Sequence, residues 1–371
     1  MKIIITYATA GAGHRKAAEA IYNSLKRACG DNDIRLIDVL TDSSGSLKFL
    51  YTKGYHLLIT HLVYFWWLGF WLTKIRPLRS FTRGISAAFN YFNSRRFNSF
   101  LIRENPDMVI STHFLPSELT AKLKLRNKIT SKLYTVITDF GVHPFWISKG
   151  TDYYVVACGY TKEVLIREGI SPSRIKELGI PVDEKFFKKY DRQEVALILG
   201  IDKDKFTVLL MTGSFGIGPL EYIANMLHDE VQVIVVCAGN KKLHERLKKR
   251  KIPNVVSFGF VNNPQELMAV SDVIITKPGG LTISEVIAME LVPVFISAIP
   301  GQESKNEEVL MQYGVGIIPK DRKQIRDIIL DLKNNPQNLE EKRAAVRKIK
   351  KYATLQELYN AVCQDNARPS G

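Results

Sequence analysis

The sequence lacks several signals that would place a chain in a specialised class. Its four cysteines, at positions 29, 158, 237 and 363, form no CxxC pair and no cysteine–histidine spacing, so neither a disulfide framework nor a zinc site is expected. It contains no Walker A sequence, and its apolar opening at residues 3–5 stops in a glycine loop, unlike a secretory signal. We expect a chain that stays inside the cell and does not hydrolyse nucleoside triphosphates.

Length and composition are those of an ordinary globular protein. The 371 residues are 46% hydrophobic and 24% charged, which favours two domains with separate cores over one domain or a disordered chain. We expect domains at 1–190 and 191–350, and a C-terminal helix at 351–371 that packs back on the first domain. The net charge of +15 attracts phosphate, whether in nucleic acid, anionic lipid or a phosphorylated substrate.

Acidic residues are absent from segment 43–103, which carries nine lysines and arginines. The same segment holds three of the four tryptophans, and its apolar part at 57–72 is shorter than the roughly 20 residues that cross a bilayer. Tryptophan prefers the headgroup level, and a basic residue near an anionic leaflet adds about 1 kcal/mol at most. We interpret 43–103 as an insertion that docks on membranes. The residues expected to dock are Trp66, Trp67, Trp71, Arg76, Arg79 and Arg83.

Two other interpretations of this insertion stay open. Its aromatic side chains could form the core of a helical pair whose basic residues are solvated. Single-stranded nucleic acid also binds aromatic and basic side chains together. We rank nucleic acid lower, because the run at 57–72 is more apolar than base stacking requires, and we expect no nucleic-acid partner.

Apolar runs alternating with helical segments predict an α/β protein with two parallel sheets. The first strand leads through a glycine loop into a helix from about Arg15 to Ala28. Ligands of doubly wound sheets bind beyond the carboxyl ends of the strands, so the loops there are the expected sites. The expected strands are 2–7, 34–40, 108–111, 133–138 and 153–157 in the first half, and 207–211, 231–237, 255–258, 273–276, 294–297 and 316–319 in the second.

The loop after the first strand combines glycine with histidine. Gly11 and Gly13 let the backbone approach a ligand, and His14 stands at the start of the following helix. A helix N-terminus lowers the proton affinity of a histidine, which favours the neutral imidazole that a general base requires. The alternative is a plain tight turn with an exposed histidine.

Two further glycine loops follow strands of the second half. They read TGSFGIGP at 212–219 and TKPGGLTISE at 276–285. Glycine N–H groups ahead of a helix form a phosphate cradle, and Lys277 suits a diphosphate. Glu285 repels phosphate and suits ribose hydroxyls, although Thr282 and Glu285 also have the spacing of a capping box. Both loops together favour a nucleotide diphosphate, while a structural turn is the alternative for the first.

These motifs, in this order, resemble the monogalactosyldiacylglycerol synthases and processive diacylglycerol glucosyltransferases, relatives of the peptidoglycan enzyme that adds N-acetylglucosamine to a lipid-linked acceptor. The resemblance covers nearly the whole chain, and it rests on segments 11–18, 138–140, 143–146, 277–285 and 300–303. It implies two Rossmann-like domains that face each other across a cleft, the GT-B glycosyltransferase fold. It also implies an N-terminal acceptor domain, a C-terminal UDP-sugar domain, inversion at the anomeric carbon and no required metal or other cofactor.

The resemblance assigns roles to single residues. Phe260 would lie against uracil, Glu285 would bind ribose, and Gln302 and Glu303 would face the sugar. Family members typically continue that last motif with Glu-Gly-Asn, whereas Ser-Lys-Asn follows here, which leaves the hexose, glucose or galactose, open. The expected donor-binding residues are Gly13, Gly213, Ser214, Phe215, Gly216, Phe260, Lys277, Pro278, Gly279, Gly280, Leu281, Thr282, Glu285, Gln302, Glu303 and Asn306.

The leading hypothesis is a single displacement in which the primary hydroxyl of diacylglycerol attacks the anomeric carbon of a UDP-hexose. We expect His14 to take the proton, with Asp139 orienting and charging it or acting as the base itself. The glycine loops and Lys277 would stabilise the leaving diphosphate in place of a metal. His143 and Trp146 are expected to line the lipid entrance, although a proline-fixed turn with a core tryptophan is the alternative.

Two rival functions are kept. The same fold could glycosylate another lipid-linked acceptor, such as a polyprenyl diphosphate sugar. The chain could also be a non-catalytic lipid or nucleic-acid binding protein that uses the two domains as a platform. Under the leading hypothesis the partners are diacylglycerol, anionic membrane lipids and a UDP-sugar, and the protein lies on the inner face of the cell membrane.

Overall fold

The chain forms two compact units. The computed structural model describes residues 1–9, 11–28, 32–41, 43–54, 57, 86, 89–296, 298–351 and 354–367. Unit 1 comprises Met1–Asp183, Ile299–Lys305 and Ala353–Gly371, and unit 2 comprises Glu184–Ala298 and Asn306–Tyr352. Unit 1 therefore takes two segments from the far end of the sequence. The expected docking residues Trp66, Trp67, Trp71, Arg76, Arg79 and Arg83 lie outside the described residues.

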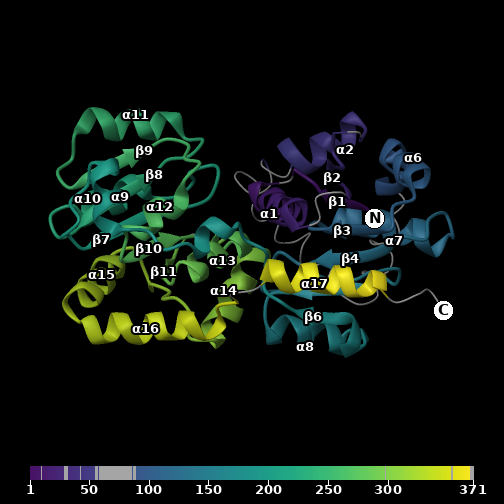
Figure 1. Ribbon diagram of the computed structural model, residues 1–371. Coiled ribbons are helices and arrows are strands. Elements are labelled where there is room, and N and C mark those ends of the chain that lie inside the picture. The colour runs from purple at the N-terminus through teal and green to yellow at the C-terminus, as the bar shows by residue number, and fades with distance from the viewer. Residues whose placement is uncertain are drawn as a thin grey trace. The chain divides into compact units, whose positions relative to one another are not determined.

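Unit 1 is built on a parallel sheet whose strand order is β2-β1-β3-β4-β5-β6 (Figure 1). Its strands are β1 (Lys2–Tyr7), β2 (Asp33–Asp38), β3 (Met108–Ser111), β4 (Lys132–Val136), β5 (Tyr153–Val156) and β6 (Ile175–Glu177). Its helices are α1 (Ala12–Ala28), α2 (Gly45–Phe49), α6 (Arg95–Glu104), α7 (Phe114–Leu125), α8 (Gly159–Arg167) and α17 (Thr354–Ala367), with short turns at η1 (Leu50–Gly54), η2 (Pro144–Trp146) and η3 (Pro172–Arg174). The central strands are almost wholly buried, as continuous apolar runs in a parallel sheet should be.

Helix α17 belongs to the core of unit 1 although it closes the sequence. Its Leu355, Leu358 and Val362 pack in the same apolar cluster as Ile21 and Leu25 of α1. The Tyr134 hydroxyl also donates to the carbonyl of Ala361 at 3.3 Å. In Figure 1 this yellow helix lies over unit 1, where it contacts α1.

Unit 2 has a second parallel sheet, of order β11-β10-β7-β8-β9. Its strands are β7 (Thr207–Met211), β8 (Gln232–Val236), β9 (Val255–Phe258), β10 (Val273–Thr276) and β11 (Val292–Phe295). Its helices are α9 (Arg192–Leu199), α10 (Leu220–Leu227), α11 (Lys241–Arg250), α12 (Pro264–Ala269), α13 (Gly280–Ala288), α15 (Gln324–Asn334) and α16 (Pro336–Ile349), with a turn at η4 (Glu184–Phe187). Helix α14 (Gln302–Gln312) begins in unit 1 and continues in unit 2.

The predicted strands of both sheets are confirmed, several with ends shifted by one or two residues, and three further details differ. The expected strand at 316–319 is wrong: only one isolated parallel bridge joins Val294 to Ile317. Gly316 has a φ of +94° and Pro319 has no N–H, so an extended ladder cannot continue there. The short strand β6 was not expected, and α1 begins at Ala12, earlier than its predicted start at Arg15.

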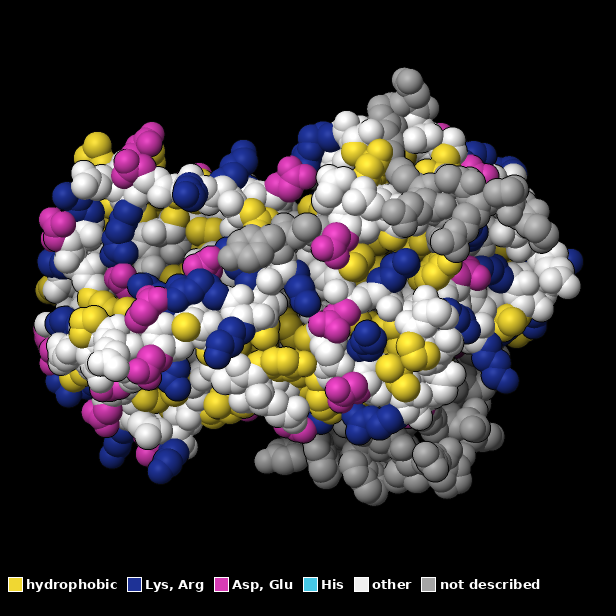
Figure 2. Space-filling view, turned by 60° about the horizontal axis from the view of Figure 1, so that its bottom comes forward, with side chains coloured by type: hydrophobic (Ala, Val, Ile, Leu, Met, Phe, Trp, Pro, Cys, Tyr) yellow, Lys and Arg dark blue, Asp and Glu magenta, His cyan; other side chains and the backbone are white. Residues whose placement is uncertain are grey.

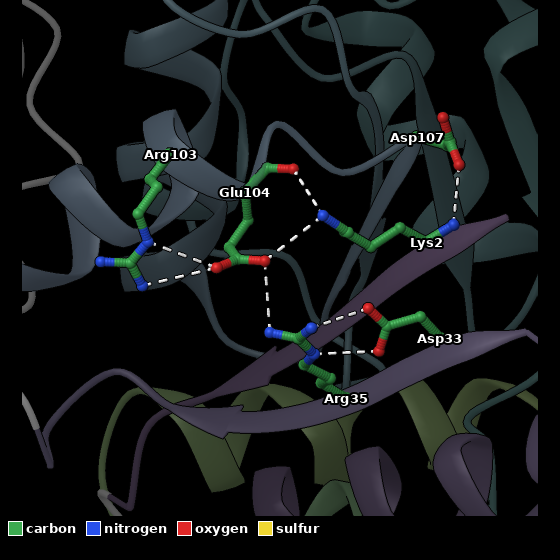
Figure 3. A network of polar contacts seen from close by, with 6 residues as sticks. All are labelled: Lys2, Asp33, Arg35, Arg103, Glu104 and Asp107. Atoms are coloured by element: carbon green, nitrogen blue, oxygen red, sulfur yellow. Dashed lines mark hydrogen bonds and ion pairs between the residues drawn. The ribbon is translucent and has the colours of Figure 1, made fainter.

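One face of the protein carries charges of both signs (Figure 2). On the face shown in Figure 2, lysine and arginine side chains are interspersed with aspartate and glutamate. Figure 3 shows one such set in unit 1, where α6 meets the amino ends of β1 and β2. Glu104 ends α6 and accepts from Lys2 at 3.3 Å and from Arg35 at 3.2 Å, and Arg35 also pairs with Asp33 at 2.8 Å. The network fastens α6 to the sheet.

Replacing Glu104 by glutamine should make unit 1 less stable at neutral pH. The hydrogen bond from Lys2 holds the pKa of Glu104 below its ordinary value of 4.5. A carboxylate whose pKa is lower in the folded than in the unfolded protein stabilises the fold above its unfolded pKa. This stabilisation is lost as the pH falls through the folded pKa. The melting temperature of Glu104→Gln should therefore lie below that of the wild type at pH 7, and the gap should close under acid. The exposed Glu163→Gln is the control, and an equal gap at every pH would contradict the expectation.

Candidate active site

His14 lies in the first turn of α1, with its imidazole held from one side. Its Nδ1 is 2.9 Å from the carbonyl oxygen of Thr112 and 2.7 Å from the hydroxyl of Thr138. A carbonyl oxygen only accepts, so Nδ1 carries the proton and donates it to Thr112. The lone pair therefore lies on Nε2, which is the arrangement that a general base needs.

The surroundings of His14 keep it neutral. Burial is the largest influence and lowers the pKa of His14, while the negative charge of Asp139 raises it. The sequence predicted a lowered pKa but gave the helix N-terminus as the reason, whereas the dominant cause in the structure is burial. The alternative of an exposed histidine in a plain turn does not fit.

Aromatic rings surround this imidazole. The ring of His113 meets His14 edge-on at 4.6 Å, and Trp146 lies 6.1 Å away. His113 stacks on Phe114 at 4.3 Å, and its Nδ1 accepts from the N–H of Leu115, which caps α7. Burial also holds the pKa of His113 well below its ordinary value, so His113 adds no charge beside the base.

Trp146 is a core residue. It is only 3% exposed and packs with Tyr154 and Leu165. The prediction that it lines a lipid entrance is corrected to the alternative, a proline-fixed turn with a core tryptophan. His143 caps that turn by accepting from the N–H of Phe145 at 3.3 Å. A lipid-facing role for His143 stays a prediction.

Asp139 follows β4 and faces a residue from the far end of the sequence. The side-chain amide of Gln302 donates to both of its carboxylate oxygens, at 2.9 and 2.8 Å. Both residues belong to unit 1. The carboxylate of Glu303 accepts from the N–H of Ile299 at 2.7 Å, which commits one oxygen to its own loop. The charge of Asp139 thus acts on His14 through space while Gln302 fixes its carboxylate.

Lys305, which stands where the resembled family typically has glycine, makes contacts within unit 1. Lys305 runs across Gly141, where an added Cβ would lie 2.5 Å from its side chain, and its ammonium sits 5.1 Å from the ring centre of Tyr160. A glycine at 305, the typical residue of the family, could make neither contact. Lys305 therefore closes over the loop that carries Asp139.

In unit 2, the loop after β7 is built around glycines that no other residue can replace freely. Gly213 and Gly216 have φ values of +85° and +59°. A Cβ on Gly216 would lie 2.1 Å from the carbonyl oxygen of Cys237. Thr212 is 5% exposed, and its hydroxyl oxygen has no hydrogen-bond partner among the described residues. A buried hydroxyl of this kind costs about 1–3 kcal/mol unless something binds it.

The loop after β10 opens helix α13. Gly279 is the N-cap and makes no side-chain cap bond, so the capping-box alternative for Thr282 and Glu285 is wrong. Glu285 is buried in the first turns of the helix, which is an unusual place for a carboxylate without a function. Asn306 donates to the carbonyl of Pro278 at 3.1 Å and so holds this loop in place.

The other expected donor residues differ in exposure. Phe260 is 68% exposed just after β9, and Phe215 is also exposed, so both rings are open to a ligand. Leu281 is buried in the core and contributes packing there. Lys277 lies between β10 and the N-cap of α13, as the sequence predicted.

Sequence reasoning gave no role to three residues that the structure places in these groups: Thr112, Thr138 and Thr212. Thr112 acts through its backbone carbonyl, which no sequence pattern reveals. Thr138 and Thr212 lie at strand ends inside segments that the sequence singles out, and the shared edge of each sheet was the available signal. His113 also follows a strand, which suggested no more than a place lining the cleft. Among the described residues, no helix could cross a membrane and no group of three metal-binding side chains occurs.

Two family models match this chain. Residues 14–182 match the monogalactosyldiacylglycerol (MGDG) synthase model, and residues 205–358 match the C-terminal domain of glycosyltransferase family 28. The processive diacylglycerol beta-glucosyltransferase of Staphylococcus epidermidis is 30% identical over 91% of this chain and 86% of its own length. The enzymes of that name from Staphylococcus aureus and Bacillus cereus are 30% and 29% identical, over 98% and 87% of this chain and 92% and 83% of their own lengths.

Solved structures share the fold at lower identity. MurG of Acinetobacter baumannii superposes with a TM-score of 0.59 at 14% identity, covering 98% of this chain and 100% of that one. HepE of Anabaena, solved with UDP, superposes with a TM-score of 0.57 at 15% identity and the same coverage. At such identity the likeness establishes the architecture: two Rossmann-like domains of the GT-B kind.

Proposed function

The chain belongs to the family of the monogalactosyldiacylglycerol synthases and processive diacylglycerol beta-glucosyltransferases, and from this premise we propose that it transfers a hexose from a UDP-sugar to the hydroxyl of diacylglycerol. The product is a glycosyldiacylglycerol. The relatives are glucosyltransferases by name, so UDP-glucose is the first donor to test, with UDP-galactose beside it. The single observation that carries the proposal is the 2.9 Å contact between His14 Nδ1 and the Thr112 carbonyl oxygen, from which the tautomer follows.

His14 supplies the base. Its Nδ1 proton is committed to the Thr112 carbonyl, so Nε2 is free to take the proton of the acceptor hydroxyl. The hydroxyl oxygen then forms a bond to the anomeric carbon while the bond from that carbon to the diphosphate breaks, and UDP leaves. The displacement inverts the α-linked donor and gives a β-glycoside. The charge of Asp139 stabilises the imidazolium that forms.

Unit 2 supplies the donor site. Its glycine loops after β7 and β10 each end at a helix whose N-terminal N–H groups favour an anion. Lys277 adds a positive charge for the leaving diphosphate, and Glu285 takes the ribose hydroxyls. Fixed donors of this kind stabilise developing charge without reorganisation, which is how we account for a reaction that needs no metal.

The membrane contact belongs to the same proposal. Diacylglycerol is a membrane lipid, so the enzyme must reach a bilayer surface. The basic, tryptophan-rich insertion 43–103 suits docking on anionic lipids at the inner face of the cell membrane. Replacing its six docking residues and measuring cosedimentation with anionic vesicles tests this part by itself.

The decisive experiment is product analysis. The protein is incubated with UDP-glucose or UDP-galactose and with vesicles that contain either diacylglycerol or a polyprenyl diphosphate sugar, with and without a chelator. The lipids are then analysed by mass. A hexosyl-diacylglycerol that forms equally well with chelator supports the proposed donor, acceptor and metal-free reaction. Transfer only to a polyprenyl diphosphate sugar would replace the acceptor, and loss of activity with chelator would overturn the metal-free mechanism.

Replacing Thr212 by valine should weaken donor binding and should keep or raise the stability of the protein without donor. We propose that its unpartnered hydroxyl donates to the diphosphate, and a hydrogen bond to a charged group contributes about 1.5–3 kcal/mol. The Kd for UDP should therefore rise by about tenfold or more. Without donor, the melting temperature should stay or rise, because valine removes the buried orphan at nearly the same volume. Thr212→Ser keeps the hydroxyl and is the matched control.

Calorimetric titration with UDP and thermal unfolding without it measure the two effects of Thr212→Val separately. A melting temperature that falls with unchanged UDP affinity would make the hydroxyl structural and contradict the proposed contact.

A further inference from the structure

The net charge of the chain is confined to two segments. Segment 43–103 has nine basic and no acidic residues, and segment 241–251 has seven basic and one acidic residue. The remaining 36 basic and 36 acidic residues cancel. The first segment is the proposed membrane insertion of unit 1. The second is helix α11 with the residue that follows it, in unit 2, and none of the expected donor-binding residues lies in it.

The basic residues of this second segment all lie on the surface of unit 2. Leu243 and Leu247 are buried in the core of unit 2, which consumes the apolar side of the helix. The seven basic side chains are exposed. They are Lys241, Lys242, Arg246, Lys248, Lys249, Arg250 and Lys251. Because the apolar side of α11 is buried in the core, only its charged side chains are available to bind a partner.

Most of these charges are not neutralised within the protein. Arg246 and Arg250 pair with Glu221 of α10 at 2.7 and 3.0 Å. The five lysines have no acidic partner in the part of the chain that the structure describes. Side chains of α11 also frame an open depression of about 490 Å³, lined by Lys241, Lys242, Glu245, Arg246, Lys249 and Arg250. The depression is open to solvent, and the positive charge around it suits a phosphodiester headgroup. The face shown in Figure 2, by contrast, mixes both signs of charge.

We propose that α11 forms a second contact with anionic phospholipid, through which unit 2 binds the membrane surface independently of the insertion in unit 1. The proposal rests on the proposed function, because a diacylglycerol acceptor brings the enzyme to a bilayer. Nucleic acid is the less favoured partner: segment 241–251 has no phenylalanine, tyrosine or tryptophan on which a base could stack. The contact is electrostatic, so it weakens with salt.

The test compares two variants of the full chain that lose the same charge from unit 2. In the α11 variant, Lys241, Lys242, Lys248 and Lys249 become glutamine. In the control, four other exposed lysines of unit 2 become glutamine, namely Lys188, Lys189, Lys320 and Lys323. Binding to phosphatidylglycerol–phosphatidylcholine vesicles and to pure phosphatidylcholine vesicles is measured by cosedimentation at several salt concentrations.

The α11 variant should bind anionic vesicles at least about tenfold more weakly than the wild type at low salt, with a shallower salt dependence, since each lysine near the surface adds about 1 kcal/mol at most. The control should stay much closer to the wild type. Equal losses in both variants, or no loss in either, would overturn the proposal. Binding to a DNA or RNA oligonucleotide is measured as well. If the α11 variant loses oligonucleotide binding but keeps vesicle binding, the partner of α11 is nucleic acid and not the membrane.

A second measurement separates this inference from the proposed function. Hexosyl transfer to diacylglycerol in neutral detergent micelles involves no anionic surface, so the α11 variant should match the wild type there. If no form transfers hexose while α11 still governs vesicle binding, the proposed function fails and the lipid contact stands. If transfer is normal and vesicle binding does not depend on α11, the lipid contact fails alone.

Discussion

Replacing His14 by alanine is expected to reduce hexosyl transfer by about 10²–10⁴-fold, the usual contribution of a general base. The loss should appear in kcat, since the imidazole takes the acceptor proton and holds no part of the donor. UDP affinity should be unchanged, because the proposed donor loops belong to unit 2. Initial rates with UDP-glucose and diacylglycerol, together with calorimetric titration of UDP, measure both quantities.

The His14→Ala result has two informative failures. Turnover within a few fold of the wild type would remove His14 as the base and leave Asp139 as the remaining candidate. A fall in the melting temperature large enough to account for the loss would point to a structural role. His14→Gln, which can still donate to the Thr112 carbonyl, is the control that keeps this contact without the base.

Replacing Gly216 by alanine should abolish measurable donor binding, with a rise in the Kd for UDP of about hundredfold or more. Two costs combine. The left-handed φ of +59° costs a residue with a Cβ about 1–2 kcal/mol, and that Cβ would lie 2.1 Å from the carbonyl oxygen of Cys237. Because the added Cβ would clash with backbone and not with a flexible side chain, the loop itself must shift. Its N–H groups then no longer point at the diphosphate.

Gly200→Ala is the matched control for this substitution. Gly200 ends α9 with a φ of +65°, and a Cβ there would meet nothing within 4 Å. It carries the same conformational cost in the same unit without the clash. The control should lower the melting temperature and leave UDP affinity unchanged. If both variants bind UDP equally well, the loop after β7 does not hold the donor.

Most of the fold could be predicted from the sequence because parallel strands buried on both faces read as continuous apolar runs. β1, β3, β7, β9 and β10 have the predicted bounds. The expected strand at 316–319 failed because its apolar residues lie in a segment bent by Gly316, and periodicity alone does not register a positive φ. The three-residue β6 was too short to stand out.

The candidate site could be predicted only in part. His14 and the two glycine loops stood out because their residue types suit the chemistry at strand ends. Which way each side chain bonds did not follow from the sequence, and Trp146 shows the limit: an aromatic beside a candidate site is as suited to a core as to a ligand. The capping-box spacing of Thr282 and Glu285 had a similar ambiguity, which the N-cap at Gly279 removed.

Residue type and order were enough to predict the two α/β halves, the loops that carry the glycines, and where the net charge lies. The order of the motifs also predicted the family. Three features became known from the folded chain alone: Thr112 fixes the tautomer of His14, Gln302 binds Asp139, and the lysines of α11 are exposed without an acidic partner among the described residues. These depend on contacts between residues distant in the sequence, and the direction of a hydrogen bond or a charged side chain is set by folding.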